Sequence, residues 1–475
     1  MGVSVKARGF GWAHAGRHGF ALRDIDLELQ SGERVLLCGN SGSGKSTLLA
    51  ALAGVLGGED EGTQEGELLL ADAHNDPQPP GHDIPVGLVL QDPDSQVISS
   101  RVGDDVAFGC ENLGIPREEI WRRVKRALST VGLRVPLDQP TAHLSGGQKQ
   151  RLALAGVLAM GAGLILLDEP TANLDPQGAA DVVAAVEAAV EETGATLVVV
   201  EHHYANWEKL IPRAVALEEG RIVENGDFHA VTDKRRVSVA NLPSRARKHS
   251  GDVTGSVSQP DLWTRELVTR FGPPRTIELP AGQCTVITGA NGTGKTTLLE
   301  TIVGLLPARG GNIEMSPQVR DGAKGPPYKW SSKQLSHRIG YVFQNPEHQF
   351  VARSVADEMR VGPQVMGEQV PEERIAELLD RLRLTGLENA NPFTLSGGEK
   401  RRLSVATALV TAPRIVLLDE PTFGQDPQTF LELVAMLREL ADAGTTLAAV
   451  THDELFIEAL GDHREHLEAG EADDD

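Results

Sequence analysis

The segment GNSGSGKST occupies residues 39–47, and a close copy, GANGTGKTT, occupies residues 289–297. Each copy follows a short apolar run and precedes a stretch whose apolar residues have helical spacing, which is typical of a phosphate-binding loop. The glycines let backbone N–H groups converge on phosphate oxygens, and the start of the following helix adds a favourable dipole. The pattern predicts that Lys45 and Lys295 reach the terminal phosphates and that Ser46 and Thr296 bind Mg²⁺.

A single match of this kind can also be an ordinary glycine-rich turn between a strand and a helix, but two matches in the same context make that alternative weak. We therefore expect two nucleotide-binding loops. Their predicted contact residues are Gly39, Asn40, Ser41, Gly42, Ser43, Gly44, Lys45, Ser46 and Thr47 in the first copy and Gly289, Ala290, Asn291, Gly292, Thr293, Gly294, Lys295, Thr296 and Thr297 in the second.

Other segments repeat at the same distance. LSGGQKQR at 144–151 recurs as LSGGEKRR at 395–402, and LILLDEPT at 164–171 recurs as IVLLDEPT at 415–422. Matches in one order at one spacing indicate a duplicated domain. Residues 234–260 are polar, rich in Ser, Gly and basic residues, and without hydrophobic period, as in a surface linker. We predict a first domain over 1–232, a linker over 233–260 and a second domain over 261–475.

Composition narrows the class of protein. The chain has 475 residues, with 45 Lys and Arg against 67 Asp and Glu, a net charge of −22 that argues against nucleic acid as the main partner. Three cysteines without a CxxC pair support neither a disulfide framework nor a zinc site and fit a reducing cytosol. The longest apolar run, residues 152–167, is shorter than the ~20 residues of a membrane span, and the start of the chain resembles no secretory signal.

Short apolar runs alternate with amphipathic stretches in both halves. Residues 164–167, 197–200, 416–418 and 447–450 are apolar without alternation, as in strands buried on both faces. Residues 117–133 and the stretch that begins at Pro371 have helical spacing. Strands separated by helices predict an α/β fold with a parallel sheet, here as tandem P-loop NTPase domains.

A carboxylate pair follows one of these strands in each half. Asp168-Glu169 and Asp419-Glu420 are 123 and 124 residues beyond the corresponding lysine. Carboxylates at the ends of parallel strands face the crevice where such sheets bind ligands. We predict that Asp168 and Asp419 bind Mg²⁺ and that Glu169 and Glu420 act as general bases toward the attacking water. The alternative, a solvated strand end, does not explain the matched spacing.

His202 and His452 follow the next apolar strand of their halves. A lone histidine is more often structural than catalytic, but equivalent placement in two copies favours a role. We assign both histidines to the γ-phosphate and the attacking water.

With these motifs the chain resembles the nucleotide-binding domains of ABC ATPases, over most of both halves, and LSGGQ and LSGGE are that family's signature. The resemblance implies ATP and Mg²⁺ as cofactors, and in each half a mainly parallel sheet, an antiparallel β subdomain and a helical signature subdomain. It further implies a head-to-tail pair of domains that sandwich two ATPs. Two signature segments would then complete the opposite sites: Ser145, Gly146 and Gly147 for the second half, and Ser396, Gly397 and Gly398 for the first.

Two stretches point to a subfamily. VLQDPDSQV around Gln91 and VFQNPEHQF around Gln344 resemble the family's Q-loop, whose glutamine senses Mg²⁺ beside the reacting phosphate and faces the membrane partner. The extension Q-[DN]-P-x-x-Q, which ends at Gln96 and Gln349, resembles the ATPases of energy-coupling-factor (ECF) importers of vitamins and metal ions. That resemblance implies an ECF transmembrane coupling protein and a substrate-binding membrane subunit as partners, at the cytoplasmic face of the cell membrane.

Some assignments stay open at this point. A tandem ATPase of the monosaccharide-importer type and a soluble ABC-F-like translation factor have comparable domain numbers. Leu174-Asp175 matches the family's D-loop, whereas the second copy has Gln425-Asp426, which departs from it. Trp12 lies where the family places an adenine-stacking aromatic, but a buried core tryptophan is an equal alternative. Phe271 is the weaker candidate of the second half.

Overall fold

The computed structural model divides the chain into two compact units, Met1–Arg236 and Val237–Asp475. It describes residues 2–15, 19–40, 42–56, 61–172, 174–235, 259–422, 425 and 427–468. Ser41, Asp426 and nearly all of the predicted linker lie outside the described residues.

The central sheet of the first unit consists of β3 (Arg34–Cys38), β5 (Val86–Val89), β6 (Leu164–Asp168), β7 (Thr196–Val200), β8 (Arg213–Glu218) and β9 (Arg221–Asp227). Its strand order is β5-β6-β7-β3-β8-β9. All neighbours pair in parallel except β8 and β9, which form an antiparallel hairpin. β7 is buried along its whole length, which explains why its sequence is apolar on both faces.

A second, antiparallel sheet and a set of helices complete the first unit. The antiparallel sheet has the order β2-β1-β4, from β1 (Ser4–His14), β2 (Leu22–Leu29) and β4 (Gly62–Ala71). The α-helices are α1 (Lys45–Ala53), α2 (Val102–Asn112), α3 (Arg117–Thr130), α4 (Gly146–Met160), α5 (Pro176–Thr193) and α6 (Phe228–Thr232). Single 3₁₀ turns are η1 (Asp94–Gln96), η2 (Thr141–His143) and η3 (Tyr204–Asn206).

The second unit repeats this plan. Its parallel sheet has the order β14-β15-β16-β12-β17, from β12 (Cys284–Thr288), β14 (Ile339–Val342), β15 (Ile415–Asp419), β16 (Thr446–Val450) and β17 (His463–His466). Its antiparallel sheet has the order β11-β10-β13, from β10 (Pro260–Val268), β11 (Glu278–Pro280) and β13 (Gly310–Met315).

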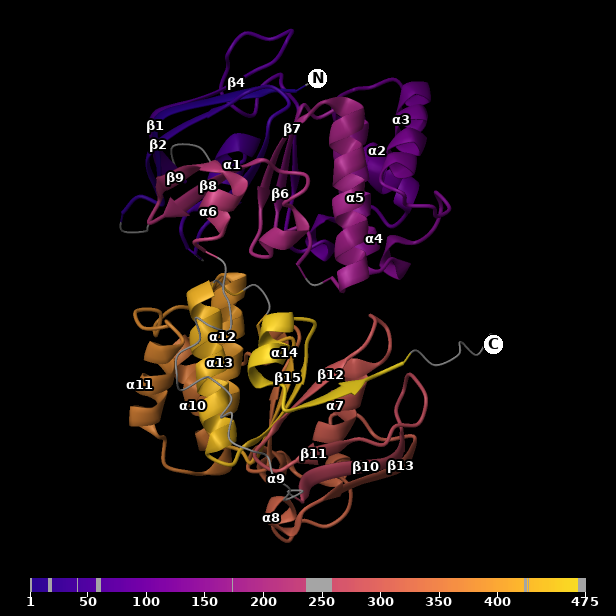
Figure 1. Cartoon of the computed structure of the whole chain (residues 1–475), viewed down its shortest axis with the longest axis vertical. Coiled ribbons are helices and arrows are strands. Elements are labelled where there is room, and N and C mark those ends of the chain that lie inside the picture. Colours follow the sequence, from indigo (N-terminus) through magenta and orange to yellow (C-terminus); the bar gives the residue numbers. More distant parts are fainter. Residues whose placement is uncertain are drawn as a thin grey trace. The chain divides into compact units, whose positions relative to one another are not determined.

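The helices of the second unit lie around its parallel sheet (Figure 1). They are α7 (Lys295–Val303), α8 (Pro317–Arg320), α9 (Ser332–Ser336), α10 (Val355–Met366), α11 (Glu372–Arg381), α12 (Gly397–Leu409), α13 (Pro427–Asp442) and α14 (Glu454–Leu460), with 3₁₀ turns η6 (Pro327–Lys329), η7 (Pro346–His348) and η8 (Pro392–Thr394). The α/β fold of tandem P-loop domains, with an antiparallel and a helical part in each, is confirmed.

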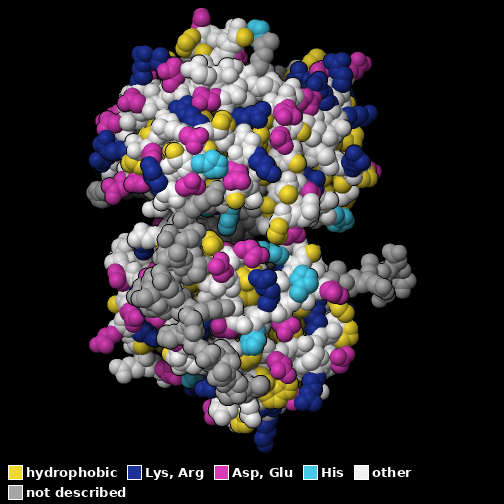
Figure 2. Space-filling model, viewed as in Figure 1, with side chains coloured by type: hydrophobic (Ala, Val, Ile, Leu, Met, Phe, Trp, Pro, Cys, Tyr) yellow, Lys and Arg dark blue, Asp and Glu magenta, His cyan; other side chains and the backbone are white. Residues whose placement is uncertain are grey.

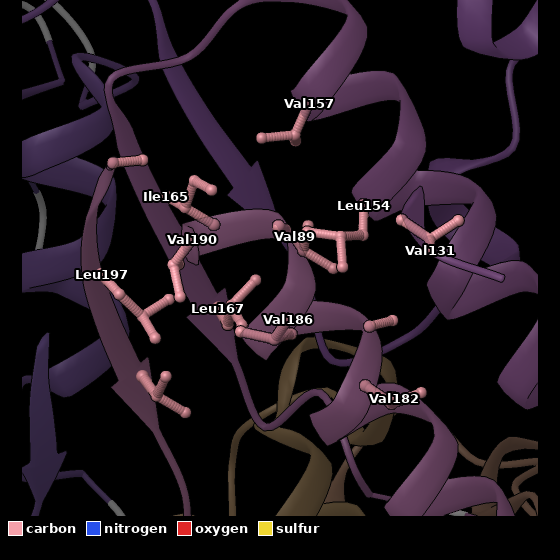
Figure 3. Packing of buried hydrophobic residues seen from close by; sticks show 14 of the residues in the cluster. Val89, Val131, Leu154, Val157, Ile165, Leu167, Val182, Val186, Val190 and Leu197 are labelled. Atoms are coloured by element: carbon pink, nitrogen blue, oxygen red, sulfur yellow. The ribbon is translucent and has the colours of Figure 1, made fainter. Parts of the chain in front are cut away.

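Apolar side chains from sheet and helices form the cores. In the first unit Ile165 and Leu167 of β6 and Leu197 of β7 belong to one buried cluster with Val186 and Val190 of α5 (Figure 3). Burying each such side chain contributes roughly 1.5–3 kcal/mol before the entropy cost of folding. This packing fixes the carboxyl end of β6, where the first carboxylate pair lies.

The cysteines are all inside the cores. Cys38, Cys110 and Cys284 are free thiols and are buried. Burial raises the pKa of the Cys38 thiol to about 11, and burial also raises the pKa of Cys110. None of the three is in a disulfide.

The surface is mixed in charge. Acidic and basic side chains are interspersed over the face that Figure 2 shows, without one dominant basic patch. Within the described part of the chain, no helix combines the length and the apolar character needed to cross a bilayer.

Candidate functional site

The two phosphate loops connect β3 to α1 and β12 to α7. The Lys45 ammonium is buried and donates from Nζ to the carbonyl oxygens of Gly39 at 2.8 Å and Asn40 at 2.9 Å. Lys295 makes the corresponding two bonds in the second unit, at 2.7 and 2.9 Å. Both lysines are thus held over the loop, where a phosphate oxygen can take over as their partner.

The last glycine of each loop approaches another segment closely. Gly44 has a φ of +100°, and a Cβ there would lie 2.7 Å from the carbonyl oxygen of Ala21. A Cβ on Gly294 would lie 3.0 Å from the carbonyl oxygen of Phe271, whose ring is 53% exposed. The Phe271 side chain therefore stands beside the second loop and is partly exposed, with the Arg270 guanidinium over its ring. In the first unit the corresponding residue is Ala21, which carries no aromatic ring.

Trp12 lies in the core instead. Its side chain is 4% exposed, and its Nε1 donates to Nδ1 of His14 at 3.2 Å. The other ring nitrogen of His14 lies 3.5 Å from the Thr47 hydroxyl. A buried indole has no free face for an adenine ring, so this position favours the core role that the sequence left open.

Glu169 follows β6 and is the centre of a small polar cluster. Gln91 donates from Nε2 to its Oε2 at 2.8 Å, and Nε2 of His202 lies 3.2 Å from its Oε1. Burial alone would raise the pKa of Glu169, but the His202 hydrogen bond and the nearby charges outweigh it and lower that pKa. Three residues that the sequence analysis predicted as catalytic are therefore brought together.

The second unit arranges its carboxylate differently. The hydroxyl of Thr451 contacts Glu420, and Gln344 is exposed. Burial and the charge of Asp419 raise the pKa of Glu420 to about 7 against this hydrogen bond. His452 follows Thr451 directly and is half-buried. The two copies thus share their carboxylates but differ in what surrounds them.

Both glutamates have an unusual backbone. Their φ values are +48° for Glu169 and +51° for Glu420, and their N–H groups donate to Val200 and Val450 at 2.9 Å. Left-handed backbone at a residue with a side chain costs energy and gathers at functional sites. The repeat of this strain in both units supports a functional role for these positions.

Asp168 and Asp419 are the candidate metal ligands. Burial and the Glu169 charge raise the pKa of Asp168 to about 6 against a hydrogen bond from Ser46. Burial also raises the pKa of Asp419 to about 6, opposed by the nearby Thr296 hydroxyl. Neither carboxylate oxygen of Asp419 has a hydrogen-bond partner of standard geometry among the described residues. A buried carboxylate in that state, beside a hydroxyl, fits the hard oxygen ligands of Mg²⁺.

The signature segments begin helices α4 and α12. Ser145 accepts from the Gln148 N–H at 3.3 Å, and Gln148 accepts in return from the Ser145 N–H at 2.9 Å. Ser396 and Glu399 form the same reciprocal cap in the second unit. Ser145, Gly146, Ser396 and Gly397 are exposed and Gly147 and Gly398 half-exposed, so these helix starts can receive an anion.

One buried position of the signature helix holds a different residue in each unit, a difference that the sequence analysis missed. Arg401 of α12 donates to the carbonyl oxygens of Phe343 at 2.5 Å and Asp419 at 3.3 Å, and also to that of Gln344. Gln150, at the same place in α4, reaches the corresponding carbonyls of its own Q-loop at 3.4 Å. Only the LSGGxKQR and LSGGxKRR difference marks this exchange in sequence.

The D-loops differ as well. Asp175 caps α5 by accepting from the Gly178 N–H at 2.7 Å. In the second copy Gln425 donates to the carbonyl oxygen of Gly398 at 3.4 Å, within its own signature helix.

A tandem arrangement of phosphate loops, strand-end carboxylates and capped signature helices defines a two-domain ATP-binding protein. The family model described as "ABC transporter" matches residues 22–172 and 274–423, and the chain belongs to this family. It is an ATPase that binds ATP in both domains. The tandem ABC ATPase that the sequence predicts is confirmed.

The chain is also similar to individual proteins. It is 34% identical to YkoD of Bacillus subtilis (strain 168), provisionally named as an HMP/thiamine import ATP-binding protein, over 93% of this chain and 85% of that one. It is 32% identical to SSO2030 of Saccharolobus solfataricus, provisionally named as an ABC transporter ATP-binding protein, over 92% and 87%. The archaeal ribosome recycling factor aABCE1, solved with the stalk protein aP1, shares the fold at a TM-score of 0.62 and 21% identity, over 94% and 84%.

Proposed function

We propose that this chain is the ATP-hydrolysing energy module of an ECF-type importer for a vitamin, a vitamin precursor or a metal ion. The observation that carries the proposal is the Q-[DN]-P-x-x-Q segment, which is present in both units and contains a short 3₁₀ turn in each, η1 and η7. The similarity to YkoD, whose name describes HMP/thiamine import, supports a vitamin or vitamin precursor as cargo. The partners would be a transmembrane coupling protein and a substrate-binding membrane subunit, with this chain at the cytoplasmic face of the membrane.

The segment links the Q-loop to the signature helix in both units. Lys149 of α4 pairs with Asp94 of η1, and Lys400 of α12 pairs with Glu347 of η7 at 2.5 Å. Gln349 is also bound to this helix, donating to the Ser404 carbonyl oxygen at 2.9 Å. Because the segment joins the Q-loop to the signature helix, a movement of either element would be transmitted to a partner bound at the segment.

Apolar side chains that flank this segment in the sequence are exposed. Ile98 is 61% exposed and Val351 is 72% exposed, and Leu90 is also exposed. Apolar side chains on the surface of a charged protein mark contact sites when they gather beside a functional element. We assign this surface to the membrane partner.

The proposed chemistry uses residues of each unit's own site. Lys45 and the loop N–H groups would bind the phosphates, while Ser46 and Asp168 would hold Mg²⁺, which neutralises phosphate charge when bound. Glu169 would accept the proton of the attacking water, and Gln91 and His202 would fix its orientation. In the second unit the same roles would belong to Lys295, Thr296, Asp419, Glu420, Gln344 and His452.

We further propose that the two domains pair head to tail, so that each signature helix completes the site of the other domain. ATP would then bind the closed pair more tightly than the open one, and this difference in affinity would drive the partner's change of shape. Hydrolysis removes the γ-phosphate and lets the pair reopen.

The double variant Ile98→Asp/Val351→Asp tests the membrane partner. Co-purification with the co-expressed coupling protein should be lost, because an aspartate on a buried apolar contact costs several kcal/mol, while ATP turnover of the isolated chain stays. Val223→Asp is the matched control, since Val223 is exposed on β9, at the sheet edge opposite β5. Retention of the partner by the double variant, or stable association of the chain with ribosomes instead, would contradict the importer assignment.

The two sites should differ in pH dependence. In Glu169→Gln, where only the second site turns over, kcat/KM should fall as the pH drops through about 7, because protonated Glu420 cannot accept a proton. In Glu420→Gln the fall should come at a lower pH, since the His202 hydrogen bond and the nearby charges lower the pKa of Glu169. Coincident profiles of the two variants would refute this difference.

A further inference from the structure

Glu201 is a buried acid that the proposed mechanism does not use. It follows β7 directly, is 2% exposed, and has no Lys, Arg or His side chain at ion-pairing distance in the part of the chain that the structure describes. A buried carboxylate needs hydrogen-bond donors to offset its desolvation. Its donors therefore show what the carboxylate holds in place.

Both carboxylate oxygens are in use. Oε1 accepts from the Thr171 backbone N–H at 3.1 Å and from the Thr171 hydroxyl. Oε2 accepts from the backbone N–H groups of His202 at 2.9 Å and His203 at 3.4 Å. One side chain thus joins the segment after β6 to the segment after β7.

These two segments hold the catalytic cluster. Thr171 lies two residues after Glu169, and the His202 imidazole contacts the Glu169 carboxylate at 3.2 Å. The Glu201 carboxylate therefore fixes the backbone on both sides of the His202–Glu169 contact. Hydrogen bonds to a charged acceptor are the stronger kind, and they hold such a contact in one geometry.

The second unit has a different residue and different hydrogen bonds at this position. Thr451 stands at the position of Glu201, and its hydroxyl contacts Glu420 directly and accepts from the Asp453 N–H at 3.1 Å. The Thr451 hydroxyl thus links the Glu420 side chain to the segment after β16, whereas the Glu201 carboxylate joins the backbones of two segments. A carboxylate that bridges two backbones is therefore a property of the first unit.

We propose that Glu201 is a positioning residue of the first ATP site, which holds the His202 imidazole on Glu169 through the backbone of both segments. This inference rests on the catalytic roles proposed above for Glu169 and His202. It makes the first site dependent on a bridge that the second site does not have.

The test uses the full chain with Glu420→Gln, so that turnover reports the first site. Glu201→Gln keeps the shape but turns an amide N–H₂ toward N–H donors, and Glu201→Thr installs the residue that the second unit carries. Each should lower kcat roughly tenfold, the usual lower bound for removing a partner that orients a reacting group, with little change in KM for ATP. Glu191→Gln, an exposed acid of α5, should change neither.

A double-mutant cycle with His202→Ala separates positioning from mere stability. If Glu201 acts through His202, the kcat losses should not add, and Glu201→Gln should have almost no further effect once the imidazole is absent. Additive losses, or unchanged kcat in both Glu201 variants, would overturn the inference. If instead His202→Ala alone leaves turnover unchanged, the catalytic assignment itself fails, which distinguishes the two claims.

Discussion

Replacement of both Glu169 and Glu420 by glutamine is expected to lower ATP turnover at least ~100-fold, within the range that a general base contributes. Glutamine keeps the size of the side chain but cannot accept a proton from the attacking water. Binding of ATP should persist, because the phosphate loops and Lys45 and Lys295 are untouched. Phosphate release at saturating ATP measures the loss, and equilibrium binding of a fluorescent ATP analogue measures the retention.

The single substitutions divide the effect between the sites. Glu169→Gln and Glu420→Gln should each slow turnover substantially, because both units keep the lysine, the carboxylate pair and the strained backbone. A single substitution without effect would mean that its site is regulatory. Glu118→Gln, which changes an exposed acid of α3, controls for the lost charge.

Lys45→Ala is expected to weaken ATP binding to the first site roughly 10- to 100-fold. The ammonium is positioned over the loop by two carbonyl oxygens at 2.8 and 2.9 Å, and hydrogen bonds to charged groups contribute about 1.5–3 kcal/mol. Since about 1.4 kcal/mol is a factor of ten, this loss is measurable by titration of the ligand. Lys295→Ala should weaken the second site similarly.

Lys45 also bonds to carbonyl oxygens of its own loop, so its removal could disturb the fold, and a control for folding is needed. Lys209→Ala removes an exposed lysine and should leave affinity unchanged. Circular dichroism and the unfolding midpoint should show that Lys45→Ala is folded. Unaltered affinity in a folded Lys45→Ala protein would remove the lysine from the phosphate site.

The parallel sheets could be predicted closely because buried parallel strands have a strong signal. Residues 164–167 lie within β6 (Leu164–Asp168), and residues 197–200 lie within β7 (Thr196–Val200). Helix α1 begins at Lys45, the lysine of the phosphate loop. Local sequence suffices where one element is buried on both faces and its loop has a fixed glycine pattern.

The aromatic assignments show why counting along the chain is insufficient. β1 pairs with its neighbours through register shifts around Phe10, and Phe10, Gly11 and Trp12 are all buried. A register shift changes the face to which the following side chains point. The distance of Trp12 from the first loop therefore gave no information about its exposure.

Buried polar partners were beyond the reach of sequence reasoning for a related reason. Glu201 and Arg401 read as ordinary charged residues beside known motifs, and only tertiary contacts show that one bridges two strand ends and the other binds Q-loop carbonyls. Each has a different residue type in the other copy. Comparing the two halves position by position is the signal that would have found them.

The three buried thiols have a practical consequence. The thiolate is the form of cysteine that attacks thiol reagents, and both burial and the raised pKa values of Cys38 and Cys110 suppress its formation in the native protein. The natural cysteines should therefore stay unmodified by maleimides at neutral pH until the cores unfold. A pair of cysteines introduced on the surface, one in each unit, could be labelled selectively without first replacing the natural three, so that spectroscopic distances between the units can be followed through a cycle of turnover.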